Sequence, residues 1–254
     1  MPEGAVSRWS RELPFRGINH QTEDVILSEA KNLSYSSNPD ATMRIGILAV
    51  QGDYEAHARM LERLGAPYLL VRTPEEVAQA GAMILPGGES TTMLKFLQEE
   101  HLAEPLQALA ARGGAFFGTC AGAILMAREV RSPGQASLGL ADVVIARNAY
   151  GRQVASEVRY APSKLKPEPL EMVYIRAPII ESVAPDVEVL ATDGGHPVLV
   201  RQGTLLLSTF HPELTDDGTV HEYFLRLAGA APPTPRETPP RQDSRIAQPG
   251  RGAI

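Results

Sequence analysis

The residue with the clearest capacity for chemistry is Cys120, the single cysteine of the chain. It stands in the segment 118–122 (GTCAG), between a short apolar run and a helical pattern. Gly-x-Cys-x-Gly is the cysteine counterpart of the Gly-x-Ser-x-Gly nucleophile elbow, in which tiny neighbours let a strand turn sharply into a helix. The pattern predicts a nucleophilic thiol beside free backbone N–H groups that suit a thiolate and an oxyanion. The alternative is a small buried cysteine that only packs as an apolar side chain.

A thiol nucleophile needs a base, and the segment 205–213 (LLLSTFHPE) offers one. Its apolar part predicts a strand ending at His211, at the edge of the sheet where α/β sites assemble. Pro212 restricts His211 to an extended backbone, and Glu213 is near enough to accept from the imidazole and orient it. Cys120, His211 and Glu213 are therefore the predicted catalytic triad. A histidine in a turn beside a solvated glutamate is the simpler alternative.

The remaining histidines suggest no further chemistry. His20 lies near the N-terminus, and His196 follows a Gly-Gly turn. His57, His101 and His221 fall on polar positions in or beside predicted helices. Because no pair has the spacing of metal ligands, the sequence predicts no metal site.

Strand and helix patterns alternate around these residues. Apolar runs of strand length occupy 44–50, 67–71, 82–85 and 115–117, and helical patterns occupy 53–64, the stretch after 86–90 (PGGES), and 121–128. Asp53 is the predicted N-cap of the first helix, and Gly65 its predicted stop. All-apolar strands that alternate with helices predict a parallel sheet covered on both faces.

Beyond Gly139 the pattern changes to shorter strand-like runs. They occupy 143–147, 153–160, 172–176, 187–191, 198–201 and 205–210. Val220, Tyr223, Phe224 and Leu227 have the spacing of a closing helix. The predicted fold is therefore three-layered α/β, with a mostly parallel central sheet, helices on both faces and additional antiparallel strands.

Composition excludes several classes of protein. The 254 residues carry 24 Lys+Arg against 30 Asp+Glu, a net charge of −6, which argues against a protein built to hold nucleic-acid phosphates. The longest nearly uncharged apolar stretch, 113–127, is shorter than the ~20 residues that span a bilayer. A single cysteine excludes an internal disulfide and a multi-thiolate metal site, and it suits the reducing cytoplasm.

The two ends differ from the middle. Residues 1–42 show no sustained period, and we expect them to be a disordered extension or to lie upstream of a true start at Met43. Residues 230–254 are rich in Pro and Arg and predict a disordered tail. The expected folded domain is 43–229.

The motifs together resemble the class I (triad) glutamine amidotransferases, and in detail the family of glutaminase subunits of pyridoxal 5′-phosphate synthase. The elbow and the His-Pro-Glu segment are common to the superfamily. More specific segments are 46–52 (GILAVQG), 85–93 (LPGGESTTM), 147–153 (RNAYGRQ), 174–178 (YIRAP) and 210–215 (FHPELT). They occur in family order across the whole expected domain. The resemblance implies the flavodoxin-like fold of that superfamily.

The resemblance also implies roles for individual residues. Cys120 would attack the side-chain amide of L-glutamine, with His211 moving protons and Glu213 orienting it. Backbone N–H groups of Gly88 and Ala121 would hold the oxyanion. The implied glutamine-binding positions are Gly88, Glu89, Ser90, Arg147, Ile175 and Arg176. Gln51 would lie near the oxyanion site and the partner contact, and Arg147 and Arg176 have the alternative of surface ion pairs.

No cofactor is implied, and the implied partner is a (β/α)8-barrel synthase subunit that uses the ammonia to make pyridoxal 5′-phosphate. Two other hypotheses stay open at this point. One is a stand-alone cysteine hydrolase of γ-glutamyl compounds, and the other is a non-catalytic regulatory subunit that keeps the fold.

Overall fold

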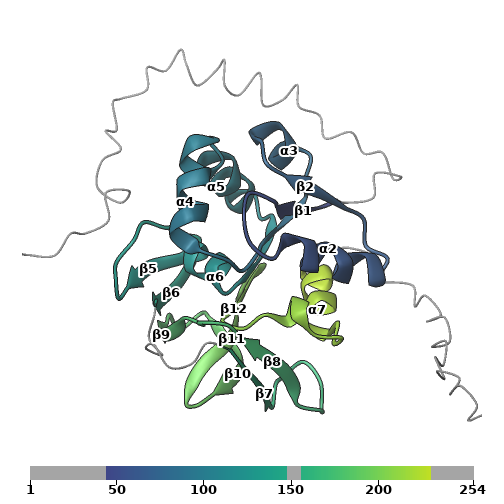
Figure 1. The fold of residues 1–254 in the computed structure, drawn as a ribbon, viewed down its shortest axis with the longest axis vertical. Helices are drawn as coiled ribbons and strands as arrows, with labels where there is room; N and C mark the ends of the chain where they lie inside the picture. Colours follow the sequence, from purple (N-terminus) through teal and green to yellow (C-terminus); the bar gives the residue numbers. More distant parts are fainter. Residues whose placement is uncertain (1–43, 148–155, 230–254) are drawn as a thin grey trace, which may run out of the picture.

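A seven-stranded sheet forms the centre of the structure, a computed structural model that describes residues 44–147 and 156–229 (Figure 1). Its strands lie in the order β10-β11-β12-β4-β3-β1-β2. They are β1 (Ile45–Leu48), β2 (Tyr68–Val71), β3 (Ala82–Leu85), β4 (Ala115–Thr119), β10 (Glu188–Asp193), β11 (His196–Gln202) and β12 (Leu205–Ser208). Strands β2, β1, β3, β4 and β12 run parallel, whereas β11 and β10 continue the sheet in antiparallel fashion.

Apolar side chains on both faces of each central strand explain the buried sheet. In β3, Ala82 and Ile84 point into one hydrophobic core, and Met83 and Leu85 point into the other. This follows from the period of two in a strand, which sends successive side chains to opposite faces. The continuous apolar runs in the sequence are therefore strands covered on both sides, as predicted.

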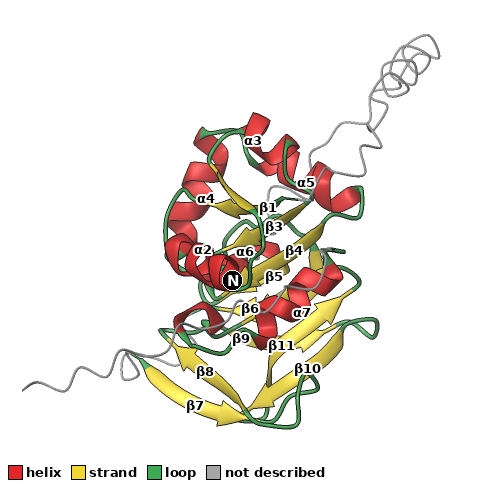
Figure 2. Ribbon diagram, turned by 90° about the vertical axis from the view of Figure 1, so that its right-hand side faces the viewer, coloured by secondary structure: helices red, strands yellow, loops and turns green. Residues whose placement is uncertain are grey.

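Helices cover the two faces (Figures 1 and 2). On one face, α2 (Tyr54–Arg63) and α7 (Thr219–Leu227) pack on the core that contains Phe117. The helices on the other face are α3 (Pro74–Ala78), α4 (Ser90–Glu99), α5 (Ala103–Ala111) and α6 (Ala121–Met126). The three-layered α/β prediction is confirmed. None of the helices in the described ranges is both long and apolar enough to cross a bilayer.

Two smaller sheets lie beside the β11–β10 end of the central sheet (Figure 1). The first contains β5 (Ala127–Arg131), β6 (Ala141–Ala146) and β9 (Ile179–Val183), and the second pairs β7 (Glu157–Ala161) with β8 (Leu170–Tyr174). The pairs β6–β9 and β7–β8 are antiparallel, as expected for the additional strands, but β5 and β6 pair in parallel.

The predicted helix 121–128 is too long. Helix α6 ends at Met126, and Ala127 turns to an extended backbone with ψ 148° and begins β5. The segment after β5 takes the last helical carbonyls, because the N–H groups of Leu138 and Leu140 donate to Leu125 and Met126 at 2.7 and 2.9 Å. This long-range bonding has no signal in the local apolar pattern.

Among the described elements, helix α3 and strands β5 and β9 were not predicted. Helix α3 does carry a local signal, a capping box in which Thr73 and Glu76 each accept from the other's backbone N–H. Segments 1–43, 148–155 and 230–254 lie outside the described residues. The expected start at Met43, the disordered ends, the motif residues 148–153 and the domain limits 43–229 therefore stay predictions.

Truncation of a core leucine tests this packing. Leu206 in β12 is 0% exposed, so Leu206→Ala should lower the free energy of unfolding by about 2–5 kcal/mol. Leu214 is 41% exposed, and the same substitution there should change it by no more than ~0.5 kcal/mol. Denaturant unfolding of both variants makes the comparison, and equal losses would contradict the assignment of β12 to the centre of the sheet.

Candidate active site

Cys120 occupies the sharp turn between β4 and α6. Its φ of 46° lies in the left-handed region, where a residue other than glycine is strained. The two neighbouring glycines make this turn possible. A Cβ on Gly122 would lie 1.8 Å from the Leu85 carbonyl oxygen, and one on Gly118 would lie 2.7 Å from the carbonyl carbon of Gly122. The predicted nucleophile elbow is present, with glycine at both positions because no side chain fits.

The elbow is held at the carboxyl ends of three neighbouring strands. The backbone N–H of Cys120 donates to the Ser208 carbonyl at 2.8 Å, which ties the turn to β12. The thiol is only 5% exposed, and its Sγ lies 3.9 Å from the Ile175 carbonyl oxygen. Cys120 therefore faces the segment that follows β8, which contains the predicted glutamine-binding residues Ile175 and Arg176.

His211 and Glu213 meet directly. His211 Nδ1 lies 2.8 Å from Glu213 Oε1, and both side chains are almost fully buried. The backbone N–H of His211 donates to the Val173 carbonyl at 2.8 Å, and Pro212 begins a short 3-10 helix, η1 (Pro212–Leu214). A Cβ on Gly87 would lie 2.2 Å from His211 Cε1, so the Gly-Gly loop lies against the imidazole.

The charge state of His211 is set by its two neighbours. Burial lowers its pKa, but the interactions with Cys120 and Glu213 outweigh burial and raise the pKa to about 10. At neutral pH the ring therefore carries a positive charge, and a cationic neighbour is the setting in which cysteine reacts as a thiolate. Of the interactions that raise this pKa, the one with the Cys120 side chain is the largest, followed by the hydrogen bond to Glu213.

Asp53 takes a different role from the one predicted. It stands at the N-cap position of α2, but its side chain makes no capping hydrogen bond. Asp53 Oδ2 lies instead 3.5 Å from His211 Nδ1. Asp53, His211 and Glu213 bring their ligand atoms within 4.8 Å of one another. His211 Nδ1 and Glu213 Oε1 already bond to each other. The positive charge of His211 is therefore sufficient to explain why two acidic side chains lie beside it.

Gln51 fixes the loop that carries the predicted oxyanion group. Its Oε1 accepts from the backbone N–H of Glu89 at 2.9 Å, and a Cβ on Gly88 would lie 2.6 Å from the same oxygen. Gly88 has a φ of 156°. Ala121, the other predicted oxyanion donor, is buried as the first residue of α6. Gln51 therefore lies beside the expected oxyanion site.

Glu89 and Arg147 meet, although they lie far apart in the sequence. Arg147 Nη2 lies 3.5 Å from Glu89 Oε1, and the arginine side chain is 11% exposed. Glu89 also caps α4, and its pKa falls to about 2, first because the Thr91 hydroxyl donates to it and then through Thr92. The carboxylate is thus ionised and already partnered, while most of the Arg147 side chain is buried beside it.

The other predicted binding residues differ in orientation. Ser90 is buried, and its hydroxyl donates to Gln135 Oε1 at 3.1 Å. Arg176 is exposed and has a φ of 45°, so the backbone is strained immediately after Ile175. Binding of glutamine by these residues stays a prediction.

Two histidines were placed wrongly by the sequence. His57 and His221 were expected on polar positions, yet both are 0% exposed, between α2, α7 and Phe117 of β4. Burial lowers the pKa of both rings, His221 to about 3, so both are neutral. A signal existed in the helical period, because His57 shares its face with Met60 and Leu61.

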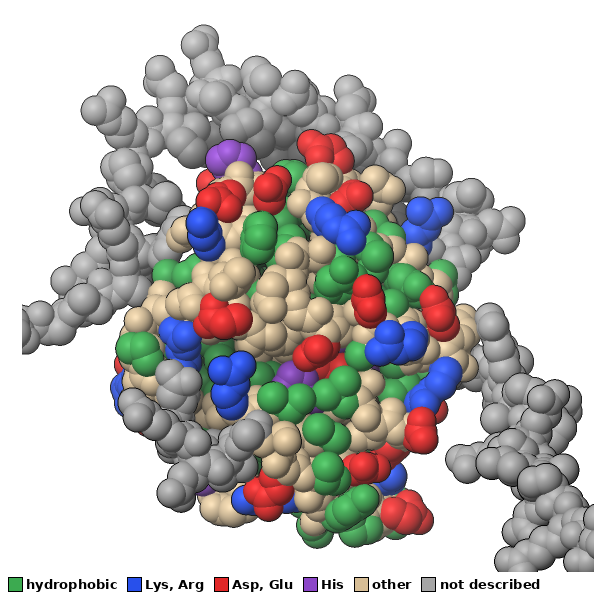
Figure 3. Space-filling view, in the orientation of Figure 1, with side chains coloured by type: hydrophobic (Ala, Val, Ile, Leu, Met, Phe, Trp, Pro, Cys, Tyr) green, Lys and Arg blue, Asp and Glu red, His purple; other side chains and the backbone are tan. Residues whose placement is uncertain are grey.

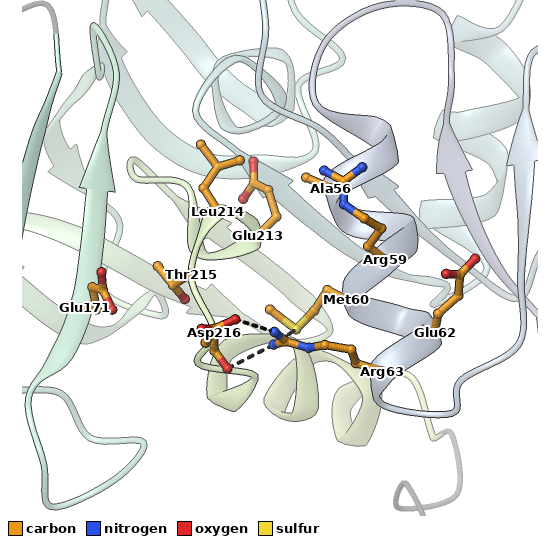
Figure 4. A pocket seen from close by; sticks show the side chains of 10 residues that line it. All are labelled: Ala56, Arg59, Met60, Glu62, Arg63, Glu171, Glu213, Leu214, Thr215 and Asp216. Carbon is orange, nitrogen blue, oxygen red and sulfur yellow. Dashed lines mark hydrogen bonds and ion pairs between the residues drawn. The ribbon is translucent and has the colours of Figure 1, made fainter. Parts of the chain in front are cut away.

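A pocket lined in part by Glu213 lies beside the triad (Figure 4). It lies between α2, β8 and η1, and Cys120 and His211 do not line it. Its lining residues are Ala56, Arg59, Met60, Glu62, Arg63, Glu171, Glu213, Leu214, Thr215 and Asp216. Arg63 bonds to the side chain and carbonyl of Asp216, each at 2.9 Å, across this pocket. On the face drawn in Figure 3, basic and acidic side chains are interspersed and no broad basic area gathers.

Comparison with known proteins decides the family. The model of the SNO glutamine amidotransferase family matches residues 47–229. The chain belongs to this family. It is therefore a glutamine amidotransferase, as the sequence motifs predicted.

Curated relatives agree along nearly their whole length. The chain is 50% identical over 185 residues to the pyridoxal 5′-phosphate synthase subunit PdxT of Koribacter versatilis, covering 73% of this chain and 95% of the relative. It is 47% identical over 192 residues to PdxT of Deinococcus radiodurans, covering 74% and 98%.

Solved structures support the fold. A crystal structure of a glutamine amidotransferase matches with a TM-score of 0.69 at 44% identity, covering 73% of this chain and 99% of that one. The structure of PurLQS from Thermotoga maritima matches with a TM-score of 0.56, at 16% identity, and covers 73% of this chain and 98% of that one. This second likeness concerns the fold alone.

Substitution of Gly122 tests the elbow. Gly122→Ala places a methyl group against the Leu85 carbonyl, so the backbone must move to make room for it. This movement should lower the free energy of unfolding by about 1–3 kcal/mol and displace Cys120. Gly134→Ala is the matched control, because a Cβ there meets only Val130 O at 3.5 Å. Denaturant unfolding and the rate of Cys120 alkylation by iodoacetamide measure both effects. Equal stability and reactivity of the two variants would refute the steric account.

The buried neutral His221 makes a prediction about acid stability. The pKa of His221 in the folded protein lies below its value of 6.5 in the unfolded chain. Its contribution to the free energy of unfolding is therefore complete above pH 6.5. This contribution is lost as the pH falls, because the unfolded chain gains the proton first. When the pH is lowered from 7 to 5, the wild type should therefore lose about 1–2 kcal/mol more unfolding free energy than His221→Phe. Exposed His196→Gln is the control. Parallel pH curves for wild type and His221→Phe would contradict the prediction.

Proposed function

We propose that this chain is the glutaminase subunit of a pyridoxal 5′-phosphate synthase, and that it hydrolyses L-glutamine to L-glutamate and ammonia. The observation that supports this most strongly is the meeting of Cys120 at a strained elbow with a charged His211 held by Glu213. Cys120, His211 and Glu213 are the proposed triad. Family membership supports the reaction, and this geometry supports the choice of these three residues as the groups that perform it.

The first half of the proposed reaction is attack by the Cys120 thiolate on the side-chain amide carbon of glutamine. The carbonyl becomes an oxyanion, for which the backbone N–H groups of Gly88 and Ala121 are the proposed donors. The imidazolium of His211 gives its proton to the amide nitrogen, the C–N bond breaks, and ammonia leaves. A γ-glutamyl thioester and a neutral His211 remain.

In the second half, neutral His211 takes a proton from water, and the resulting hydroxide attacks the thioester. The C–S bond breaks, glutamate leaves, and the thiolate–imidazolium pair is restored. Glu213 accepts from Nδ1 throughout, which holds the ring in one orientation and stabilises its charged form. The 2.8 Å distance between Nδ1 and Oε1 suits this role.

For substrate binding we propose the positions Gly88, Glu89, Ser90, Arg147, Ile175 and Arg176. The Ile175 carbonyl oxygen lies 3.9 Å from Cys120 Sγ, which supports a role for this segment beside the reacting end of the substrate. Arg147 is a suitable partner for the α-carboxylate, because a guanidinium offers paired donors to a carboxylate. Its ion pair with Glu89 orients the guanidinium beforehand.

The partner we propose is a (β/α)8-barrel synthase subunit that receives the ammonia. The names of the relatives describe them as synthase subunits, and the match covers 95% and 98% of the length of two of them. Gln51, which holds the Gly88–Glu89 loop, is the proposed link between the partner contact and the oxyanion site. The proposed compartment is the cytoplasm, which keeps the thiol reduced.

Removal of the thiol tests the proposal directly. In the presence of the synthase subunit, Cys120→Ala should lower glutamate release from glutamine by at least about 10³-fold, because no nucleophile remains. Ser182→Ala on exposed β9 is the matched control and should keep full turnover. Glutamate is measured enzymatically, and thermal unfolding confirms that both variants fold.

The outcomes separate the three hypotheses. Retained turnover in Cys120→Ala would refute the triad. Turnover of γ-glutamyl compounds without the synthase subunit, and without ammonia transfer to it, would indicate a stand-alone hydrolase. A wild-type Cys120 that a glutamine-analogue electrophile fails to label would indicate a non-catalytic subunit.

A further inference from the structure

A buried chain of polar side chains continues from the triad into the interior. The Thr119 hydroxyl lies 3.2 Å from Glu213 Oε1, and His57 Nε2 lies 3.1 Å from the same hydroxyl. His57 Nδ1 then lies 2.9 Å from His221 Nε2. All of these side chains are buried, and His57 and His221 come from the two helices that cover this face of the sheet.

The hydrogen bonds of this polar chain all run in one direction. Both histidines are neutral, so each ring has one donor and one acceptor nitrogen. The Thr119 hydroxyl donates its one hydrogen to Glu213 Oε1, so it must itself accept from His57 Nε2–H. His57 Nδ1 is then an acceptor, and His221 Nε2–H donates to it. Every hydrogen in the chain points towards Glu213.

The far end of the chain fits this direction. The assignment leaves His221 Nδ1 without a hydrogen, and this atom is buried and makes no hydrogen bond within the described ranges. A buried polar atom without a partner destabilises the folded state, so the arrangement has an energetic cost. A role that depends on the chain's direction would explain why the core keeps two histidines where apolar rings would fit beside Phe117.

Within the described residues, the polar contacts of the Glu213 carboxylate converge on one oxygen. Oε1 faces His211 Nδ1 at 2.8 Å, Thr119 at 3.2 Å and His57 Nε2 at 3.5 Å, whereas Oε2 makes no hydrogen bond within the described ranges. The orientation of the carboxylate therefore depends on these contacts to Oε1. Without Thr119 and His57, the Glu213 carboxylate would be held only by His211, and it could not orient that ring independently.

We propose that His57 and His221 are positioning residues of the catalytic triad, which hold the Thr119 hydroxyl as a donor to Glu213 Oε1 through a one-directional chain of hydrogen bonds. The inference rests on the proposed function. It assigns the two histidines no contact with substrate. Their effect reaches the reaction through Thr119, Glu213 and His211 in turn.

The test is a set of variants of the full chain, assayed for glutamate release with the synthase subunit. His57→Phe removes the donor and keeps an aromatic ring beside Phe117, and it should lower kcat by about 10–100-fold with less than about a 3-fold change in KM for glutamine. His57→Gln keeps an N–H donor near the Nε2 position and should recover much of kcat. Phe224→Leu is the matched control, because Phe224 packs on Phe117 with ring centroids 5.5 Å apart and has no polar atom. It should lower thermal stability and leave kcat within about 2-fold.

A double-mutant cycle shows whether the effect passes through Thr119. In a Thr119→Val background, His57→Phe should change kcat by less than about 2-fold, because the chain of hydrogen bonds is already interrupted at position 119. If His57→Phe does not fold, His221→Phe breaks the chain one link further back and should lower kcat with the same dependence on Thr119.

Several results would overturn the proposal. They are a wild-type kcat in His57→Phe, a loss that His57→Gln does not recover, and an equal loss with and without the Thr119 hydroxyl. Wild-type protein that releases no glutamate would refute the proposed function, and this inference with it. An active wild type beside an equally active His57→Phe would refute the positioning role alone.

Discussion

The backbone contact between Gly122 in α6 and the Leu85 carbonyl at the end of β3 sets the position of the nucleophile. Helix and strand approach so closely that a single Cβ would close the gap to 1.8 Å. This approach forces the chain to leave β4 through a left-handed residue, and that residue is Cys120. The strain is tolerated because three paired strands and a buried helix surround the turn.

Histidine appears in two opposite charge states within this small region. The pKa of His211 rises to about 10, while that of His221 falls to about 3, although both are buried. The difference comes from their neighbours. His211 lies against the carboxylate of Glu213 and beside Cys120, so its charge is compensated, whereas His57 and His221 meet each other, a hydroxyl and aromatic rings. Burial alone disfavours the charge, and burial beside an anion reverses the result.

Local sequence was sufficient for the parts of the site that depend on adjacent residues. The elbow and the glutamate two positions after His211 are short-range patterns, and the structure has them where they were predicted. The strand before His211 is also present, but it ends at Ser208 rather than at His211. It was not sufficient where position depends on packing between distant segments. Asp53 has the sequence context of a helix cap, but the nearby His211 engages its side chain. His57 and His221 are 164 residues apart, and only the packing of α2 and α7 on β4 brings them together.

The order of strands in the central sheet has a consequence for how the protein comes into being. Strand β4 pairs with β3, which precedes it, and with β12, which is made much later; Thr119 and Glu213 are 94 residues apart. A chain emerging from the ribosome can form the early strands long before His211 exists. The thiol therefore meets its histidine only after the whole segment between them has been made, so a product truncated before His211 would carry a cysteine without its base.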